Sequence, residues 1–539
     1  MRISDSALLT ILLLASSANA IPSAVFQRRC AELSHNFSPS ADIKVLASEF
    51  LPNGTRFTNP ENHPSCQRQP YTTLLVDICR LQLNVTTSKT SNVLVEVWMP
   101  TSWEQKQKRV IVTGNGGLGG CTQFYDMSYL NYLGFAAIGS NNGHLGDTGV
   151  PFLNRPEVVK DFVYRAVHTA ATLGKRAVKA FYRKDLGKSY FVGCSTGGRQ
   201  GLKAAQDFPD LFDGILSGAA SNDFNNLMSI SGSWYKTLGS SSSPNFVTAE
   251  QWATVSDLVY QQCDGIDGVM DRVIEDPMKC VPRPEALLCQ SGETWASNKC
   301  LTSAQVTAVR KFYEPLYGNN GSLLYPRINP GGELASARFW LHGNPPQYLQ
   351  EWFRYAVYND VNWNVDDNFD LSAVDHANLV DPFGQSTWKS DLSGLKSTGN
   401  KLITYHGLMD GLITSENSYR YYELVSRTMG LASSDLDEFF RYFPIPGLNH
   451  CASGNGAWYV GAGSQITAWS PAEIDSYYRG SLLYSLVKWV EDGVAPERIL
   501  GRNIAANGTV LAEKRHCKWP LQNVYLGGDA SRQSNWGCQ

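Results

Sequence analysis

The chain has 539 residues, of which 43% are hydrophobic and 18% charged, and its formal net charge is −3. This balance offers nothing basic that would attract nucleic acid or an anionic membrane surface. No stretch approaches the ~20 uninterrupted apolar residues of a membrane-spanning helix. We therefore expect neither partner, and the length alone favours roughly three or four domains of ~150 residues each.

Residues 1–20 have the pattern of a secretory signal peptide. Arg2 is followed by the apolar run Ala7–Ala15 and then by Ala18 and Ala20, the small residues of a cleavage site. The apolar run is too short to span a bilayer. We expect a soluble, secreted, extracellular protein.

The expected secretion of the protein bears on whether its cysteines form disulfides. The chain has 12 of them, and in an oxidising compartment an even number is typical of a disulfide set with no free thiol. Five Asn-x-Ser/Thr sequons predict surface positions, with N-glycosylation if the host is eukaryotic. The sequon residues are Asn36, Asn53, Asn84, Asn320 and Asn507.

Strands and helices alternate along the first third of the chain. Three segments have the composition of strands, and a long segment with apolar residues at helical spacing follows before a fourth strand. The strands are Val93–Met99, Arg109–Thr113, Phe135–Ile138 and Ser189–Val192, and the helix is Pro156–Phe181. This alternation predicts a mainly parallel sheet with helices on both faces, the α/β class.

Ser195 is the centre of a Gly-x-Ser-x-Gly motif at residues 193–197. The strand Ser189–Val192 precedes it, a helix-forming segment at 201–206 follows it, and Gly214–Ala219 is the next expected strand. This is the context of a nucleophile elbow, in which a sharp turn projects the serine hydroxyl toward the substrate. The backbone N–H of Thr196 would then be one donor of an oxyanion hole.

A second oxyanion donor is expected from the glycine-rich loop at residues 114–120, at Gly116 and Gly117. The same loop also matches the Gly-x-Gly-x-x-Gly pattern of dinucleotide-binding proteins. That alternative is disfavoured because Cys121 stands where a helix should begin, and because exported proteins seldom use free nicotinamide cofactors. We expect no organic cofactor.

The alternation is lost from Asn222 and resumes with a compact strand at Lys401–His406. Clustered cysteines, prolines and aromatic residues fill the interval. We interpret it as an inserted lid domain at residues 222–395. The flanking residues 21–221 and 396–539 would then form one discontinuous catalytic domain.

The base and the acid of a catalytic triad are expected after this insertion. The hydrolase chain order is serine, acid, histidine, which favours His450 as the base. Asp410 follows the strand that resumes the core and would orient the imidazole. Weaker candidates for the acid are Glu416, Asp435 and Asp437.

Two cysteines adjoin the proposed nucleophile and base. Cys194 precedes Ser195, and Cys451 follows His450. A serine needs its histidine within about 3 Å, so the two neighbouring cysteines would also come close together. We predict a disulfide that links them.

An acidic segment at residues 263–273 suggests a cation site inside the insertion. Asp264, Asp267 and Asp271 are spaced by glycines, and the carbonyl groups of Val269 and Val273 could complete an oxygen shell suited to calcium. The register differs from that of an EF-hand. The alternative is an acidic turn stapled by a disulfide.

Together, the Cys194-Ser195 elbow, the loop from His406 to Asp410 and the pair His450-Cys451 resemble the tannase and feruloyl esterase family, in particular its fungal secreted members. The resemblance implies an α/β-hydrolase core with an inserted lid that carries a structural calcium. It also implies specific disulfide pairings, which sequence alone does not yield. These are Cys30–Cys79, Cys66–Cys121, Cys263–Cys280, Cys289–Cys300 and Cys517–Cys538, beside Cys194–Cys451.

The implied activity is that of a serine esterase on feruloyl (hydroxycinnamoyl) esters of plant cell-wall polysaccharides. Galloyl esters of tannins are the second expectation, and a non-catalytic carbohydrate-binding protein on the same fold is a third. We expect a monomer or homodimer. Aromatic residues of the lid that could stack on the acid, or could equally form the lid's own core, are Trp234, Phe339, Trp340, Trp352, Phe353 and Tyr355.

Overall fold

The computed structural model describes residues 21–37, 40–58, 63–66, 71–290, 299–461, 465, 471–505 and 507–539. The expected signal peptide lies outside the described residues. In the described part of the chain, no helix has the length and apolar character needed to cross a membrane.

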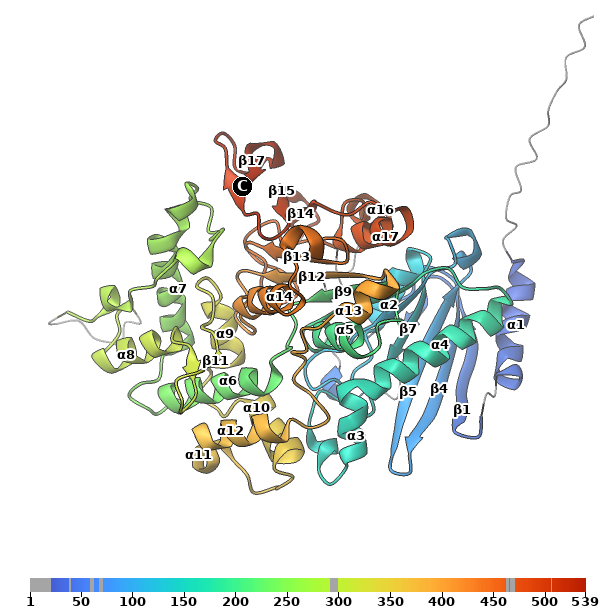
Figure 1. The fold of residues 1–539 in the computed structure, drawn as a ribbon, viewed down its shortest axis with the longest axis horizontal. Helices are drawn as coiled ribbons and strands as arrows, with labels where there is room; N and C mark the ends of the chain where they lie inside the picture. Colours follow the sequence, from blue (N-terminus) through green and yellow to red (C-terminus); the bar gives the residue numbers. More distant parts are fainter. Residues whose placement is uncertain are drawn as a thin grey trace, which may run out of the picture.

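A nine-stranded sheet forms the centre of the molecule (Figure 1). Its first strands pair antiparallel up to β7, and β7, β6, β8, β9, β12 and β13 then run parallel to their neighbours. The parallel strands are almost entirely buried, as their continuous apolar sequences require. In spatial order the strands are β1 (Ile43–Leu51), β4 (Ile78–Ser88), β5 (Ser91–Pro100), β7 (Ala136–Ser140), β6 (Val110–Thr113), β8 (Ser189–Cys194), β9 (Gly214–Gly218), β12 (Lys401–Gly407) and β13 (Phe440–Ile445).

Helices cover both faces of this sheet, which confirms the predicted α/β class. One apolar core lies under α1 (Ser23–Asn36), α4 (Ala166–Tyr182), α5 (Thr196–Asp207) and α14 (Glu416–Met429). A second core, on the opposite face, lies under α2 (Phe124–Tyr132) and α17 (Leu482–Asp492).

The single helix predicted over Pro156–Phe181 is interrupted. It consists of α3 (Pro156–Lys160), a π-helical turn (Asp161–Arg165) and α4. The buried guanidinium of Arg199 donates hydrogen bonds to the carbonyl oxygens of Phe162 and Val163, at 3.3 and 3.0 Å, within this turn. Periodicity continues through a π turn, so the sequence did not reveal it.

Strands β9 and β12 pair directly, although some 180 residues separate them in sequence. The chain between them forms mainly short helices around a separate apolar core, beside the sheet in Figure 1. Its elements are α6 (Phe224–Leu238), α7 (Ala249–Cys263), α8 (Ser303–Phe312), β10 (Leu316–Tyr317), β11 (Leu323–Tyr325), α9 (Glu333–Phe339), α10 (Gln347–Glu351), α11 (Val365–Asn368), α12 (Leu371–Val380) and α13 (Ser393–Thr398). This arrangement agrees with an inserted lid, and the exact domain boundaries stay a prediction.

The C-terminal segment adds small hairpins beside the parallel end of the sheet. Lys514 forms a buried ion pair with Glu275, which joins this segment to the insertion. The remaining elements are α15 (Ser433–Leu436), α16 (Pro471–Tyr478), β14 (Arg498–Ile504), β15 (Val510–Cys517), β16 (Asn523–Tyr525), β17 (Trp536–Cys538) and, near the N-terminus, β2 (Arg56–Phe57) and β3 (Thr72–Thr73).

All 12 cysteines are paired, and no free cysteine remains. The six disulfides are the Cys194–Cys451 bond predicted from the neighbouring serine and histidine and the five that the family resemblance implied. The disulfide framework is therefore confirmed.

Candidate active site

Ser195 occupies a tight turn between β8 and α5. Its backbone has φ 64° and ψ −124°, a strained conformation for a residue other than glycine. The turn brings the backbone of Gly193 against Gly197, so that a Cβ at either position would collide with neighbouring main-chain atoms. The glycines of the motif are thus required by packing, and the serine stands at the N-terminus of α5, where developing negative charge is favoured.

Asp410 and His450 lie close together at the carboxyl ends of β12 and β13. Asp410 lies in the loop after β12, and His450 lies in the loop after β13. The imidazole Nδ1 is 2.8 Å from the Asp410 Oδ2 atom. Ser195 and His450 line the same two cavities. Of the four acids considered from sequence, Asp410 is the one hydrogen-bonded to His450; Asp437, for example, pairs with Lys518 instead.

The Asp410 carboxylate is fully buried and receives several hydrogen bonds. The backbone N–H groups of Leu412 and Ile413 donate to Oδ1 at 2.8 and 3.0 Å. Burial alone would raise the pKa of Asp410, but His450 and His406 together outweigh it through their charges and hydrogen bonds and lower the pKa below its usual range. The carboxylate is therefore ionised at the pH where the imidazole would act.

His406 is the site residue that sequence reasoning did not single out. Its fully buried ring places Nε2 3.1 Å from Asp410 Oδ2 and 3.0 Å from the carbonyl oxygen of Ile413. Both of these atoms are acceptors, so Nε2 carries the hydrogen, and Nδ1 lies 2.7 Å from the Ser418 hydroxyl. A histidine at the end of a strand four residues before the acid was the available signal.

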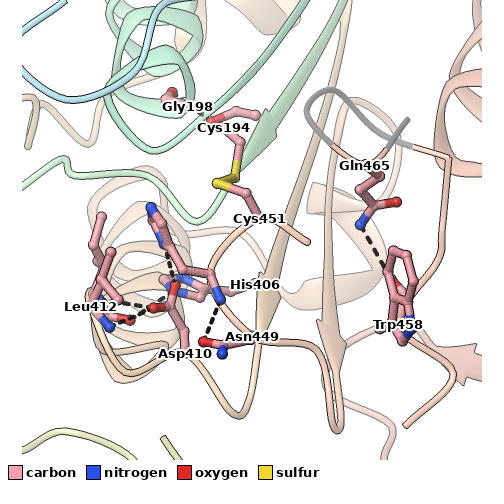
Figure 2. The surroundings of a disulfide bond; sticks show 12 residues. Cys194, Gly198, His406, Asp410, Leu412, Asn449, Cys451, Trp458 and Gln465 are labelled. Atoms are coloured by element: carbon pink, nitrogen blue, oxygen red, sulfur yellow. Dashed lines mark hydrogen bonds and ion pairs between the residues drawn. A yellow bond between two sulfur atoms is a disulfide. The ribbon is translucent and has the colours of Figure 1, made fainter. Parts of the chain in front are cut away.

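The Cys194–Cys451 disulfide connects the elbow to the histidine loop. The two Cα atoms are 5.9 Å apart, and the bond joins positions separated by 257 residues. Figure 2 shows this bond beside the hydrogen bonds of Asp410 and the Asn449 side chain. Asn449 Oδ1 accepts from the His450 backbone N–H at 2.7 Å. His450 is therefore fixed by both of its sequence neighbours: Asn449 through this hydrogen bond and Cys451 through the disulfide.

The glycine-rich loop packs against the elbow, as the oxyanion prediction requires. The Thr196 hydroxyl donates to the Gly117 carbonyl oxygen at 2.5 Å, and the Asn115 N–H donates to Gln200 Oε1 at 2.9 Å. Gly117 has φ +59°, and Gly116 lines the larger of the two cavities. These contacts place the loop beside the serine. They favour its interpretation as an oxyanion loop rather than as a dinucleotide-binding loop.

Two cavities of different chemistry meet at Ser195, His450 and Gly117. The smaller has a volume of about 60 Å³ and lies between the sheet and the insertion. Most of its lining is apolar or aromatic: Phe224, Leu227, Met228, Phe339, Trp340, Leu412 and Ile413. The larger, of about 240 Å³, is lined mainly by residues of the catalytic core.

Only part of the predicted aromatic set faces these cavities. Phe339 and Trp340 line the smaller one. Trp234, Trp352 and Phe353 are buried in the core of the insertion, which bears out the alternative that they are structural residues. Tyr355 packs against the same core.

The acidic segment of the insertion has features that fit a cation. Asp264 is 3% exposed, and its Oδ1 has no hydrogen-bond partner. Burial raises the pKa of Asp267 and of Asp271, and the negative charges of Asp271 and Asp264, respectively, raise them further. In the part of the chain that the structure describes, no group of three or more His, Cys, Asp or Glu side chains is arranged to hold a metal ion. Backbone carbonyl groups would have to complete the set, and the calcium site stays a prediction.

Three of the predicted glycosylation residues are exposed in turns or loops: Asn53, Asn320 and Asn507. Asn84 is half-buried on β4 and accepts a hydrogen bond from Asn92. The Asn36 side chain lies outside the described part of the chain. Exposure is compatible with the predicted sugars, which stay a prediction.

A mainly parallel sheet with a serine elbow after β8 and a hydrogen-bonded Asp–His pair after the later strands defines an α/β-hydrolase. The chain belongs to the family described as "Tannase and feruloyl esterase", whose model matches residues 79–539. It is accordingly a carboxylic ester hydrolase. The resemblance stated from sequence is thus confirmed.

The similar proteins extend along nearly the whole chain. A probable feruloyl esterase B-2 of Neosartorya fischeri is 41% identical over 536 residues, 98% of this chain and 99% of the relative. The crystal structure of feruloyl esterase B from Aspergillus oryzae is 41% identical, has a TM-score of 0.89 and covers 95% of this chain and 100% of its own. A tannin acyl hydrolase from Aspergillus niger, at 18% identity and a TM-score of 0.71 over 96% of this chain and 95% of its own, shares the fold.

Proposed function

We propose that this protein hydrolyses feruloyl and related hydroxycinnamoyl esters through a Ser195–His450–Asp410 triad. The observation that carries the proposal is the Asp410–His450 hydrogen bond beside a serine in a strained elbow, where both cavities open. The substrate comes from the relatives, which are feruloyl esterases B at 41% identity over almost the full length.

The geometry supports a two-step acyl transfer. His450 takes the proton of the Ser195 hydroxyl, and the serine oxygen attacks the ester carbonyl. The oxyanion receives hydrogen bonds from backbone N–H groups of Thr196 and the Gly116–Gly117 segment. Protonated His450, stabilised by Asp410, gives its proton to the departing alcohol.

The acyl-enzyme is then hydrolysed by the same groups in reverse order. His450 removes a proton from water, the resulting hydroxide attacks the acyl carbonyl, and the Ser195 oxygen leaves with the proton from His450. The smaller cavity suits the aromatic acid, because its apolar lining can bury a phenyl ring.

The decisive variant is Ser195→Ala. We expect kcat on methyl ferulate to fall by ~10⁴-fold or more, because the nucleophile is lost. Circular dichroism and the melting temperature should stay those of the wild type. Substantial turnover by a folded Ser195→Ala protein would overturn the triad.

A panel of methyl ferulate, methyl caffeate and methyl gallate tests the substrate class. We expect the highest kcat/KM on a hydroxycinnamate. A preference for gallate would favour tannase activity instead, and no turnover on any of the three would favour a carbohydrate-binding protein.

The same proposal includes secretion, N-glycosylation and a structural calcium ion. The Asp264, Asp267 and Asp271 carboxylates and the carbonyl groups of Val269 and Val273 would hold the ion, which would neutralise their mutual repulsion. The triad and the backbone donors carry out every catalytic step, and the ion would have a structural role.

A further inference from the structure

Asp147 of the core forms hydrogen bonds in two directions, to the glycine-rich loop and to the insertion. Its Oδ1 atom accepts from the Leu118 N–H at 2.8 Å, and its Oδ2 atom accepts from the Tyr348 hydroxyl at 2.5 Å. Leu118 belongs to the loop at residues 114–120, and Tyr348 belongs to α10 of the insertion. The Asp147 side chain is therefore a direct link between the lid and the loop that is expected to bind the oxyanion.

A second side chain of α10 strengthens this link. Glu351 Oε2 accepts from the Gly149 N–H at 2.6 Å and from the Thr148 hydroxyl at 3.0 Å. The helix is itself fixed in the lid, because Leu349, which lies between the two contact residues, is fully buried in the core of the insertion. One short helix of the lid thus holds three consecutive residues of the catalytic core.

On the other side of the link, the peptide unit between Gly117 and Leu118 is held at both of its polar ends. Its carbonyl oxygen accepts from the Thr196 hydroxyl at 2.5 Å, and its N–H is the donor to Asp147. A Cβ on Gly117, whose φ is +59°, would collide with the side chains of Asp147 and Tyr348, so the link packs directly against the loop. Fixing this peptide unit constrains the neighbouring N–H of Gly117, which the proposed mechanism directs at the oxyanion.

The backbone around Asp147 is also well anchored. Gly146 and Gly120 exchange two backbone hydrogen bonds, at 3.1 and 3.2 Å, which hold the far end of the glycine-rich loop. The Asp147 N–H donates to Ser65 Oγ at 2.8 Å. A side chain on a backbone restrained in this way transmits a displacement of the lid to the loop, because it has little freedom to move independently.

We propose that Asp147 is a positioning residue that makes the geometry of the oxyanion loop depend on the lid. While Tyr348 and Glu351 hold residues 147–149, the Asp147 side chain keeps the Gly117–Leu118 peptide in place. Movement of α10 away from the core withdraws this support, and the loop then stabilises the oxyanion less well. The inference rests on the proposed esterase function and adds to it a residue that acts through the loop.

Two substitutions at Asp147 test the hydrogen bonds. Asp147→Ala removes both acceptors, and kcat on methyl ferulate should fall ~10-fold or more, part of the effect of losing an oxyanion donor outright. Asp147→Asn should recover most of kcat, because its amide oxygen can accept from Leu118 while its NH₂ group donates to the Tyr348 oxygen. Tyr348→Phe removes only the donor from the lid and should lower kcat several-fold.

Tyr235→Phe is the matched control. The Tyr235 hydroxyl donates to Asp366 Oδ1 at 2.9 Å, which is also a tyrosine–aspartate hydrogen bond but lies entirely within the insertion. Its loss should leave kcat unchanged. Equal losses of kcat in Tyr235→Phe and Tyr348→Phe would show that any loosening of the lid lowers activity, and would overturn the proposal.

Inhibition by phenylboronic acid distinguishes a displaced oxyanion loop from a general loss of packing. The Ser195 oxygen adds to the boron, its proton passes to His450, and the tetrahedral boronate presents an oxygen where the oxyanion would lie. In Asp147→Ala the inhibition constant should rise by about the factor by which kcat/KM falls.

The planar ester provides the comparison for the boronate. The affinity of the Ser195→Ala protein for methyl ferulate, measured by isothermal titration calorimetry, should change less than ~2-fold when Asp147→Ala is added, because the ground state carries no oxyanion. An unchanged inhibition constant, or equal losses of affinity for the boronate and the ester, would overturn the proposal.

Hydrogen–deuterium exchange tests the link without relying on catalysis. The N–H groups of residues 114–120 should exchange at least several-fold faster in Asp147→Ala and in Tyr348→Phe than in the wild type or Tyr235→Phe. If the wild type cleaves no ester and does not bind the boronate, the proposed function fails, whereas faster exchange still supports the link between lid and loop. Wild-type exchange rates in both variants would overturn that link.

Discussion

The ionised oxygen of Asp410 is shared by two imidazoles, those of His450 and His406. The hydrogen-bonded chain therefore extends two residues beyond the triad, through His406 to the Ser418 hydroxyl that adjoins the His406 Nδ1 atom. His406 touches no substrate, so it is a positioning residue. Its hydrogen bond fixes the Asp410 carboxylate in the plane from which His450 is oriented.

His406→Phe should test this role. The variant keeps a buried ring but removes the donor, and we expect kcat to fall ~10-fold, since a hydrogen bond to a charged group contributes about 1.5–3 kcal/mol. Without this donor the pKa of Asp410 rises and the carboxylate stabilises protonated His450 more strongly. The acid limb of the kcat/KM profile should therefore move to higher pH.

His406→Gln is the matched variant, because its amide can still donate to Asp410. It should recover most of kcat and return the acid limb toward that of the wild type. If the Phe and Gln variants lose kcat equally and share an unshifted pH profile, His406 contributes packing alone.

Among single residues, the sequence predicted those that a motif or the order of catalytic residues along the chain identifies. Ser195 carries its own signature, and the chain order suffices for Asp410 and His450. The role of His406 depends on the turn after β12 that folds Asp410 back onto the strand. The hydrogen bond from Tyr348 of the insertion to Asp147 of the core joins residues that are 201 positions apart. Neither contact has a local signature.

At the scale of elements, the Cys194–Cys451 disulfide spans the edge of the sheet at which the catalytic residues lie. It joins the end of β8 to the loop after β13, across β9 and β12. Loss of this bond frees the histidine loop relative to the elbow, while the sheet remains paired.

The double change Cys194→Ala/Cys451→Ala should therefore lower kcat by more than it lowers the folded fraction. We expect a destabilisation of ~2–5 kcal/mol, typical of a native disulfide, measured by urea denaturation. The control is Cys517→Ala/Cys538→Ala, which opens a C-terminal hairpin disulfide and should leave kcat per folded molecule unchanged. Parallel losses of activity and folded protein in the first variant would show a purely stabilising bond.

Five strands of the parallel half, β7, β6, β8, β9 and β12, were predictable because each is a short, continuous apolar run between turn signals. The antiparallel β1 and β4 and the strand β13 were not expected. The helices of the insertion also escaped prediction, since many are short and their apolar residues face a core assembled from distant segments. The π turn at Asp161–Arg165 is fixed by Arg199 on another helix.

At the scale of the whole molecule, the acidic segment connects the insertion to the C-terminal region. Beside the Glu275–Lys514 ion pair, the Asn523 side chain donates to Glu275 at 3.1 Å. A cation bound at Asp264, Asp267 and Asp271 would therefore stabilise a junction between two regions that lie far from Ser195 in sequence. Its effect should be on stability.

Exhaustive treatment with a chelator should lower the melting temperature measurably, while kcat per folded molecule changes little. Added calcium should restore the melting temperature. In an Asp267→Asn variant, which weakens the site, chelation should have a smaller effect. A wild-type melting temperature that is the same with and without chelator would contradict the calcium proposal.

The alternation of strands and helices along the sequence predicted the fold class but not the way in which the parts of the molecule join. The five disulfides beyond Cys194–Cys451 followed only from the family resemblance, because an even cysteine count permits many pairings. The buried Lys514–Glu275 pair links residues that are 239 positions apart. Such contacts arise from the assembled fold, so no window of sequence contains them.

The disulfide at the active site also determines what a protease could do to this molecule. Every peptide bond of the insertion lies inside the loop that Cys194 and Cys451 close. A single cut in the lid would therefore leave the two halves of the catalytic core in one covalent molecule, with the serine and its histidine still tethered. Such a nicked protein would keep its mass apart from one added water, and its two fragments would separate only after reduction.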